Sequence, residues 1–241
     1  MLVGAALAPA LHAQSTTFSG TVALSSQLVD RGQALTRDTP VLQGAASWTV
    51  PAGWALGLAA SAEVHSSSHL VGALAHVSRY WSLSGDWQMQ ASLFYYRYSG
   101  TARARAYDRV ETGIDWTYRD VLTLGVSAIH VIGAKSDRPR GAADLTVHWP
   151  LAGQLSLSAG VGVAQLLASP YQRYRCRCAD AGRDNDRDDR NDFYGYGQVG
   201  LLWSSGPWQV ELDRLAADPA IRRQGDDLGA SPWVATVSRS F

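Results

Sequence analysis

Apolar and small polar residues alternate along nearly the whole chain, and this period of two restricts the fold more than any other feature. Such alternation is typical of β-strands whose two faces meet different surroundings. No segment carries a helical stripe of more than two turns, so we expect an all-β protein. The first segment shows the pattern, with Phe18, Val22, Leu24 and Leu28 on one face and Ser19, Thr21, Ser25 and Gln27 on the other.

Twelve alternating segments are expected to form strands. Since an even number of strands can close on itself with both chain ends at one rim, this number suits a barrel. The first segment begins at Phe18, and the others cover residues 42–50, 54–64, 70–81, 87–97, 109–118, 121–131, 143–149, 155–165, 193–203, 208–215 and 233–241.

The connecting segments alternate in length. Short turns are expected at 51–53, 82–86, 119–120, 150–153 and 204–207, and longer links at 32–40, 65–69, 98–108, 132–140, 168–192 and 216–231. Short turns at one rim and long loops at the other are typical of outer-membrane barrels. We therefore predict an up-and-down antiparallel transmembrane β-barrel with short periplasmic turns and longer extracellular loops.

Tryptophan positions give an independent indication of this fold. The chain has nine Trp, and eight of them adjoin the short turns. Indole rings prefer the headgroup level of a membrane, so a ring of Trp at one rim is expected to form a periplasmic aromatic girdle. Its members are Trp48, Trp54, Trp81, Trp87, Trp116, Trp149, Trp203 and Trp208.

The polar face of the strands is rich in Gly, Ser, Thr and Ala, which suits the interior of a narrow barrel. Among the charged and amide residues on this face, acidic groups outnumber basic ones, so an open lumen would mildly favour cations. Pairing of Arg109 with Glu111 or Asp115 across a closed interior, or blockage by Tyr194 and Tyr196, is the equally weighted alternative. The lumen-lining candidates are Arg31, Gln43, Glu63, Arg109, Glu111, Asp115, Asp144, Glu211 and Asp213.

Composition excludes several other classes. The chain carries 21 Lys+Arg and 21 Asp+Glu, and this zero net charge argues against a nucleic-acid partner. No run of 18 apolar residues is present, so no α-helical membrane span is expected. A hydrophobic content of 46% likewise argues against a disordered chain.

The first residues look like an export signal without its charged beginning. Residues 2–11 are apolar, and Leu11-His12-Ala13 before Gln14 has the character of a cleavage site. The first basic residue is Arg31, so Met1 is expected to lie within a longer natural leader. We therefore expect a truncated signal peptide at 1–13 and a single barrel domain at 14–241, with a charged extracellular loop at 168–192.

The start of the mature chain carries a longer signature, Phe18-Ser-Gly-Thr-Val-Ala-Leu-Ser-Ser-Gln-Leu-Val-Asp-Arg31-Gly32, followed by Pro40-Val-Leu-Gln43-Gly44. It resembles the start of a proteobacterial outer-membrane β-barrel family of unknown function, labelled Gcw_chp, whose first strand ends in Arg-Gly. The similarity covers about the first 45 mature residues and the final Ser-Arg-Ser-Phe. The resemblance implies a fold and a location, and no activity.

The last strand and the longest loop carry further signals. Phe241 ends the alternating final segment, as in the signal that directs barrels to the outer-membrane insertion machinery. Residues 173–192 hold six Arg and six Asp, which predicts a self-neutralising surface loop able to meet lipopolysaccharide phosphates rather than a calcium site. Cys176 and Cys178 are too close for an unstrained disulfide and lack further metal ligands nearby, so no metal site is expected.

Two alternatives to a channel or structural barrel remain. His65 and Ser67 have the His-x-Ser spacing of outer-membrane phospholipases, but no third residue to orient the His is identifiable. A secreted soluble β-protein is the other alternative. We expect a non-enzymatic, monomeric barrel of the bacterial outer membrane, without a cofactor, whose partners are outer-membrane lipids, lipopolysaccharide and the insertion machinery.

Overall fold

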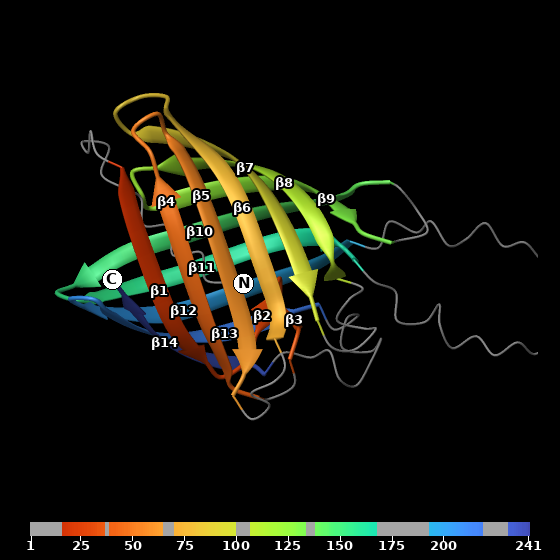
Figure 1. Ribbon diagram of the computed structural model, residues 1–241. Coiled ribbons are helices and arrows are strands. Elements are labelled where there is room, and N and C mark those ends of the chain that lie inside the picture. The colour runs from red at the N-terminus through yellow and green to blue at the C-terminus, as the bar shows by residue number, and fades with distance from the viewer. Residues whose placement is uncertain are drawn as a thin grey trace, which may run out of the picture.

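The alternating segments form one closed antiparallel sheet in the computed structural model, which describes residues 16–36, 39–64, 70–99, 107–133, 138–167, 193–218 and 231–241. Each strand pairs with its neighbour in the chain, and the first strand pairs with the last (Figure 1). The predicted fold class, a twelve-stranded antiparallel barrel, is therefore confirmed in the described part of the chain.

The strands differ little from the predicted segments, and two of them, β8 and β11, coincide with the prediction. The barrel strands are β1 (Thr17–Ser25), β4 (Val41–Thr49), β5 (Trp54–Glu63), β6 (Leu70–Ser82), β7 (Trp87–Tyr98), β8 (Arg109–Tyr118), β9 (Leu122–Val131), β10 (Arg140–Ala152), β11 (Leu155–Gln165), β12 (Phe193–Ser205), β13 (Trp208–Ala217) and β14 (Trp233–Ser240).

Three predicted turns are shorter in the structure, because β6 continues to Ser82, β12 to Ser205 and β10, with the largest difference, to Ala152. The prediction ended a strand at Trp149 and made 150–153 a turn, but β10 continues to Ala152. Pro150 has no N–H to donate, and the register of β10 against β11 shifts between Pro150 and Ala152. The sheet tolerates proline here because the strand is about to end at the rim.

A second correction concerns the segment after the first strand. The prediction placed Leu28 on the outer face with Phe18, but β1 ends at Ser25 and Leu28 is 2% exposed. A small hairpin follows, formed by β2 (Val29–Asp30) and β3 (Gln33–Ala34). Arg31 and Gly32 connect them with φ values of +48° and +75°, as a type I′ turn requires. The Arg-Gly pair is therefore a hairpin turn and not the end of the first strand.

The outside of the barrel is covered by exposed apolar side chains. Phe18, Leu58 and Val161 are exposed by 69%, 67% and 60%, and outward positions on every barrel strand are largely apolar. So much exposed apolar surface on a closed sheet requires a lipid environment, which makes this a transmembrane barrel of the bacterial outer membrane. Within the described ranges, no helix is long and apolar enough to cross a membrane.

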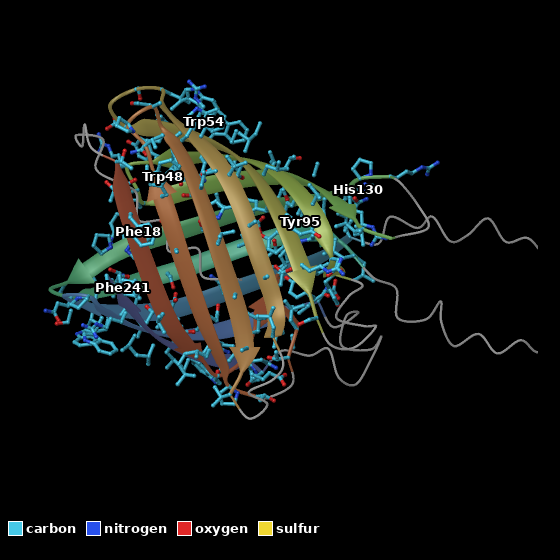
Figure 2. The ribbon with its side chains drawn as sticks, in the orientation of Figure 1. Phe18, Trp48, Trp54, Tyr95, His130 and Phe241 are labelled. Atoms are coloured by element: carbon cyan, nitrogen blue, oxygen red, sulfur yellow. The ribbon has the colours of Figure 1, made fainter. Side chains whose placement is uncertain are left out.

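The eight Trp near the short turns lie on the outer face, as strand alternation requires. Trp87 contacts Tyr118 with ring centroids 5.1 Å apart, and the Arg239 guanidinium lies over the Trp208 ring at 5.5 Å. Figure 2 shows Trp48 and Trp54 on the outer surface of the wall. These positions suit the proposed role of an aromatic girdle at the membrane interface.

The seam between β1 and β14 is completed by the last residue. The Gly20 N–H donates to the Phe241 carbonyl at 2.9 Å, and the Phe241 N–H donates to the Gly20 carbonyl at 3.0 Å. The Phe241 ring covers Gly20 so closely that a Cβ there would overlap it. Glycine is therefore required at position 20 for the terminal ring to pack on the wall.

Candidate functional site

All nine predicted lumen residues lie on the inner side of the wall or on the hairpin inside it. Their placement follows from strand parity, because each shares its face with other inward residues across the registers. Arg31 lies in the β2–β3 turn, Gln43 on β4, Glu63 on β5, Arg109, Glu111 and Asp115 on β8, Asp144 on β10, and Glu211 and Asp213 on β13.

The inner segment, which we define as Ser26–Thr36, folds into the lumen. Its ends are held together by Gln27, whose side-chain amide donates to the Thr36 carbonyl at 3.0 Å. The Leu28 N–H donates to the Thr36 hydroxyl at 3.0 Å, and the Leu35 N–H donates to the Leu28 carbonyl at 2.8 Å. These bonds satisfy the backbone of a segment that crosses the interior, away from the barrel ladder.

A charged cluster fastens the inner segment to β8. Arg109 is 1% exposed and pairs with Asp30 at 2.8 Å and with Glu111 at 3.3 Å. Both terminal nitrogens of Arg31 donate hydrogen bonds to Glu111, one to each carboxylate oxygen. The hairpin thus contributes one anion and one cation, and β8 contributes the complementary pair.

The electrostatics of the hairpin match this arrangement. Burial raises the pKa of Asp30, but attraction to Arg109 and Arg31 outweighs burial and brings the pKa down to about 2. For Arg31, burial lowers the pKa, but attraction to Asp30 and Glu111 outweighs burial and raises it well above its usual value. Both groups therefore stay charged throughout the physiological pH range.

Tyrosines and aliphatic side chains fill the lumen around this cluster. The Arg109 guanidinium lies 3.9 Å from the centre of the Tyr96 ring, and the Tyr107 hydroxyl donates to the Gln33 side chain at 2.9 Å. The extracellular half of the described lumen is therefore packed rather than open. The buried residues there are Tyr98, Tyr107, Ile129, Val131, Ala142, Ala164, Leu167 and Tyr194, with Leu28, Val41 and Val71 beside them.

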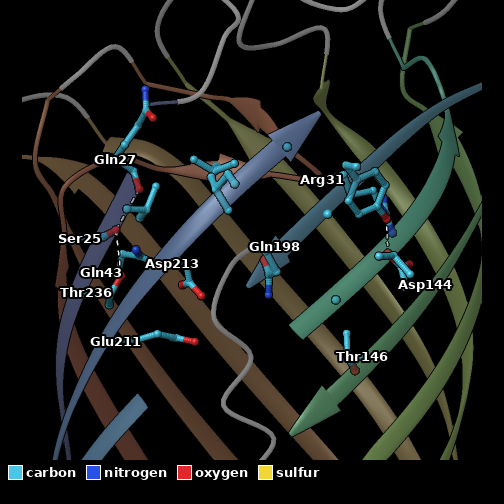
Figure 3. A pocket seen from close by; sticks show the side chains of 18 residues that line it. Ser25, Gln27, Arg31, Gln43, Asp144, Thr146, Gln198, Glu211, Asp213 and Thr236 are labelled. Atoms are coloured by element: carbon cyan, nitrogen blue, oxygen red, sulfur yellow. Dashed lines mark hydrogen bonds between the residues drawn. The ribbon is translucent and has the colours of Figure 1, made fainter. Parts of the chain in front are cut away.

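An acidic cavity of about 190 Å³ lies beside the inner segment (Figure 3). Glu211 and Asp213 project into it from β13, and Asp144 faces it from β10. The Tyr196 hydroxyl donates to Asp144, and the Ser158 hydroxyl donates to Glu211 at 3.4 Å. Arg31 and several apolar residues also line the cavity. Its remaining lining includes the amides and hydroxyls of Ser25, Gln27, Gln43, Thr146, Gln198 and Thr236.

The acidic wall has no basic partner in the described ranges. No Lys, Arg or His nitrogen there lies within 4 Å of a carboxylate oxygen of Asp115, Asp144, Glu211 or Asp213. Arg31 and Arg109 are already paired with Glu111 and Asp30, and Arg140, on the inward face of β10, donates to the Leu166 carbonyl. The acidic side chains of this cavity therefore have no ion-pair partner among the described residues.

The structure also settles a face that the sequence left ambiguous. In the register of β5 with β6, Gly57 pairs with His76 and Trp54 pairs with Arg79. A Cβ on Gly57 would overlap the His76 ring, so this histidine lies inside the barrel, over the glycine. Arg79 lies on the opposite, membrane-facing side.

Sequence reasoning missed Asp30, the central anion of the cluster, and the tyrosines of β7. Asp30 precedes the Arg-Gly pair and lies outside any alternating strand, so periodicity carries no signal for it. Tyr96 and Tyr98 do lie on the inward parity of β7 with Gln88 and Gln90. Their inward position was a signal that sequence reasoning did not use.

Several predicted features lie outside the described residues. These are the signal segment 1–13, the His65 and Ser67 pair, the Arg/Asp-rich loop 168–192, and Cys176 with Cys178. Within the described ranges, no group of three or more His, Cys, Asp or Glu side chains is arranged to hold a metal ion.

Comparisons with known proteins reveal similarity of fold. No family model matches the chain, and none of the curated proteins matches its sequence. A solved KdgM porin superposes with a TM-score of 0.54 at 8% identity, covering 92% of this chain and 98% of that one. A NanC porin superposes with a TM-score of 0.54 at 11% identity, covering 93% and 99%. The chain therefore has the fold of a small outer-membrane porin, and its resemblance to the Gcw_chp family stays a prediction.

Proposed function

We propose that the protein is a small, passive, cation-preferring channel of the outer membrane, closed on its extracellular side by the inner segment. The observation that carries this proposal is the acidic wall of Asp144, Glu211 and Asp213, which faces the cavity without a basic partner among the described residues. Rings of acidic side chains favour cations in pores. The similarity in fold to small porins supports a channel over an enzyme.

The closing segment is held by contacts that can be broken reversibly. Two ion-pair contacts, Asp30 with Arg109 and Arg31 with Glu111, fasten it to the wall. Hydrogen bonds from Arg31 to the Ser127 hydroxyl and from the Ala235 N–H to the Ser26 hydroxyl add to them. No disulfide fastens it, because residues 26–36 contain no cysteine. A segment fastened in this way can leave the lumen without unfolding the barrel.

The proposal also assigns partners. The barrel is proposed to act as a monomer, with outer-membrane lipids and lipopolysaccharide around its apolar wall. The insertion machinery is proposed to recognise the last strand through Phe241.

Ion selectivity in planar bilayers tests the channel. The refolded protein, shown to be a compact barrel by its heat-modifiable gel mobility, is recorded under a potassium chloride gradient. We expect a reversal potential that indicates cation preference, and a shift toward zero in the double variant Glu211→Gln, Asp213→Asn. Asp86→Asn is the control, because Asp86 lies in a periplasmic turn and pairs with Arg119 in solvent.

Two results would contradict the proposal. An unchanged reversal potential in the double variant would remove the acidic wall as the selectivity element. A folded barrel that stays silent both as wild type and as Asp30→Asn would favour a structural or surface role.

A further inference from the structure

The outer wall carries an apolar groove of about 540 Å³ on the side formed by β1 and β4 to β7. Its depth comes from differences in side-chain size along one register row. Ala46 pairs with Leu58, Leu58 with Ala75, and Ala75 with Tyr95, so that small residues lie between large ones. Figure 2 shows Phe18 toward one side of this region and Tyr95 toward the other.

A single arginine lies at the periplasmic end of the groove. Arg79 is two residues beyond Val77, a groove residue on the same face of β6, which places it roughly 7 Å further along the strand. Its guanidinium carbon is 5.3 Å from the ring centres of both Trp54 and Trp81. The two indole rings thus hold the cation on the membrane-facing surface.

Arg79 has no carboxylate partner among the described residues, unlike Arg119 at the same rim. Arg119 pairs with Asp86 at 2.8 Å, whereas no carboxylate oxygen in the described ranges lies within 4 Å of Arg79. The buried Nε of Arg79 has no hydrogen-bond partner there either. The charge is half-buried against apolar rings, so an external anion would compensate it better than any described residue does.

The depth of Arg79 in the membrane follows from its neighbours. The Tyr80 N–H donates to the carbonyl of Gly53, in the β4–β5 turn, at 2.8 Å. Arg79 therefore lies level with a periplasmic turn and with the aromatic girdle, where lipid phosphates are found. The groove extends from there toward the middle of the wall, at the depth of acyl chains.

We propose that Arg79 and this groove form a binding site for one phospholipid of the periplasmic leaflet. The lipid phosphate binds the Arg79 guanidinium, and an acyl chain lies in the groove over Ala75 and Val77. The charge of the phosphate complements the unpartnered cation, and the apolar lining complements the chain. The site is on the outer wall and is independent of the lumen and of the proposed channel.

Native mass spectrometry of the detergent-refolded barrel with added phosphatidylglycerol tests the charged end of the site. We expect retained lipid on the wild type and affinity reduced about fivefold in Arg79→Gln, the factor that corresponds to about 1 kcal/mol per arginine at a membrane surface. Arg239→Gln is the matched control, because Arg239 also faces outward over a Trp ring at this rim, on β14, four strands from β6.

A second variant tests the groove itself. Ala75→Trp fills the space between Leu58 and Tyr95 and is expected to reduce retention of phosphatidylglycerol and of zwitterionic phosphatidylcholine alike. Ala235→Trp, at an outward position on β14, is its control. Heat-modifiable gel mobility selects variants that fold. Equal losses in Arg79→Gln and Arg239→Gln, or undiminished retention in folded Ala75→Trp, would overturn the site.

Discussion

Replacing Asp30 with Asn is expected to release the inner segment from the lumen. In the wild type, the Asp30 carboxylate lies 2.8 Å from a terminal nitrogen of Arg109, and the Arg109 side chain is 1% exposed. The other terminal nitrogen of Arg109 is buried with no hydrogen-bond partner in the described ranges. The substitution keeps the size of the side chain and removes the only negative charge of the hairpin, which is the one that pairs with Arg109.

The magnitude follows from the burial of the pair. Removing one partner of a buried ion pair typically costs about 3–5 kcal/mol. Glu111 remains 3.3 Å from Arg109 in the variant, so the lower end of this range applies. A loss of about 3 kcal/mol of docking free energy corresponds to a roughly hundredfold increase in the ratio of undocked to docked segment. In the undocked state water solvates Arg109, so the missing ion pair raises the free energy of the docked state only.

Single-channel recording measures this ratio as the time spent open divided by the time spent closed. We expect a roughly hundredfold rise in the ratio of open to closed time for Asp30→Asn, while Asp86→Asn behaves as wild type because its pair with Arg119 is exposed to solvent. If folded Asp30→Asn barrels opened no more often than wild type, the ion pair would not hold the segment and the reasoning would fail.

Three further predictions concern pH, the hairpin turn and the barrel seam. Because docking lowers the pKa of Asp30 from 3.8 to about 2, its contribution of about 2 kcal/mol to docking is complete above about pH 4 and is lost as the pH falls toward 2. Open times should therefore stay constant from pH 8 to about pH 4 and rise progressively between about pH 4 and pH 2. Gly32→Ala places a Cβ at φ +75°, 3.0 Å from side chains of β12 and β13. It should weaken docking of the inner segment by about 1–2 kcal/mol and raise open times in the same recordings. Unchanged open times would argue against a strained turn. Phe241→Ala uncovers Gly20 and should lower the free energy of unfolding in lipid vesicles, measured in urea, by about 1 kcal/mol; an unchanged urea midpoint would contradict packing at the seam.

The wall of the barrel was predictable because each strand carries its own evidence. The alternation over Arg109–Tyr118 and Leu155–Gln165 is complete, and those strands have the predicted ends. Pro150 was predicted to lie in a turn because proline usually interrupts strand pairing. A strand can continue through a proline close to its end, and the sequence does not show where the strand ends. The face of β6 was ambiguous because Ala73 and Ala75 alternate with residues of mixed character, and only the register with β5 decides it.

The contents of the lumen were much less predictable. Two-residue strands such as β2 and β3 are too short to show a period. The contact of Asp30 with Arg109 joins residues 79 positions apart, and strand parity gives no information about such contacts. Sequence could indicate that Arg109 and Glu111 share a face, and it raised their pairing as one alternative. It could not show that a segment from the start of the chain enters between them.

The seam has a consequence for how the protein is made. Thr21 pairs with Ser240, so the contact that closes the barrel joins residues 219 positions apart. Contacts so distant in sequence form late and slowly. Until β14 pairs with β1 in the membrane, β1 has no partner for one of its edges, and an unpaired strand edge readily associates with other chains. The unfolded protein therefore depends on being kept apart from its own copies until its last strand has paired with its first.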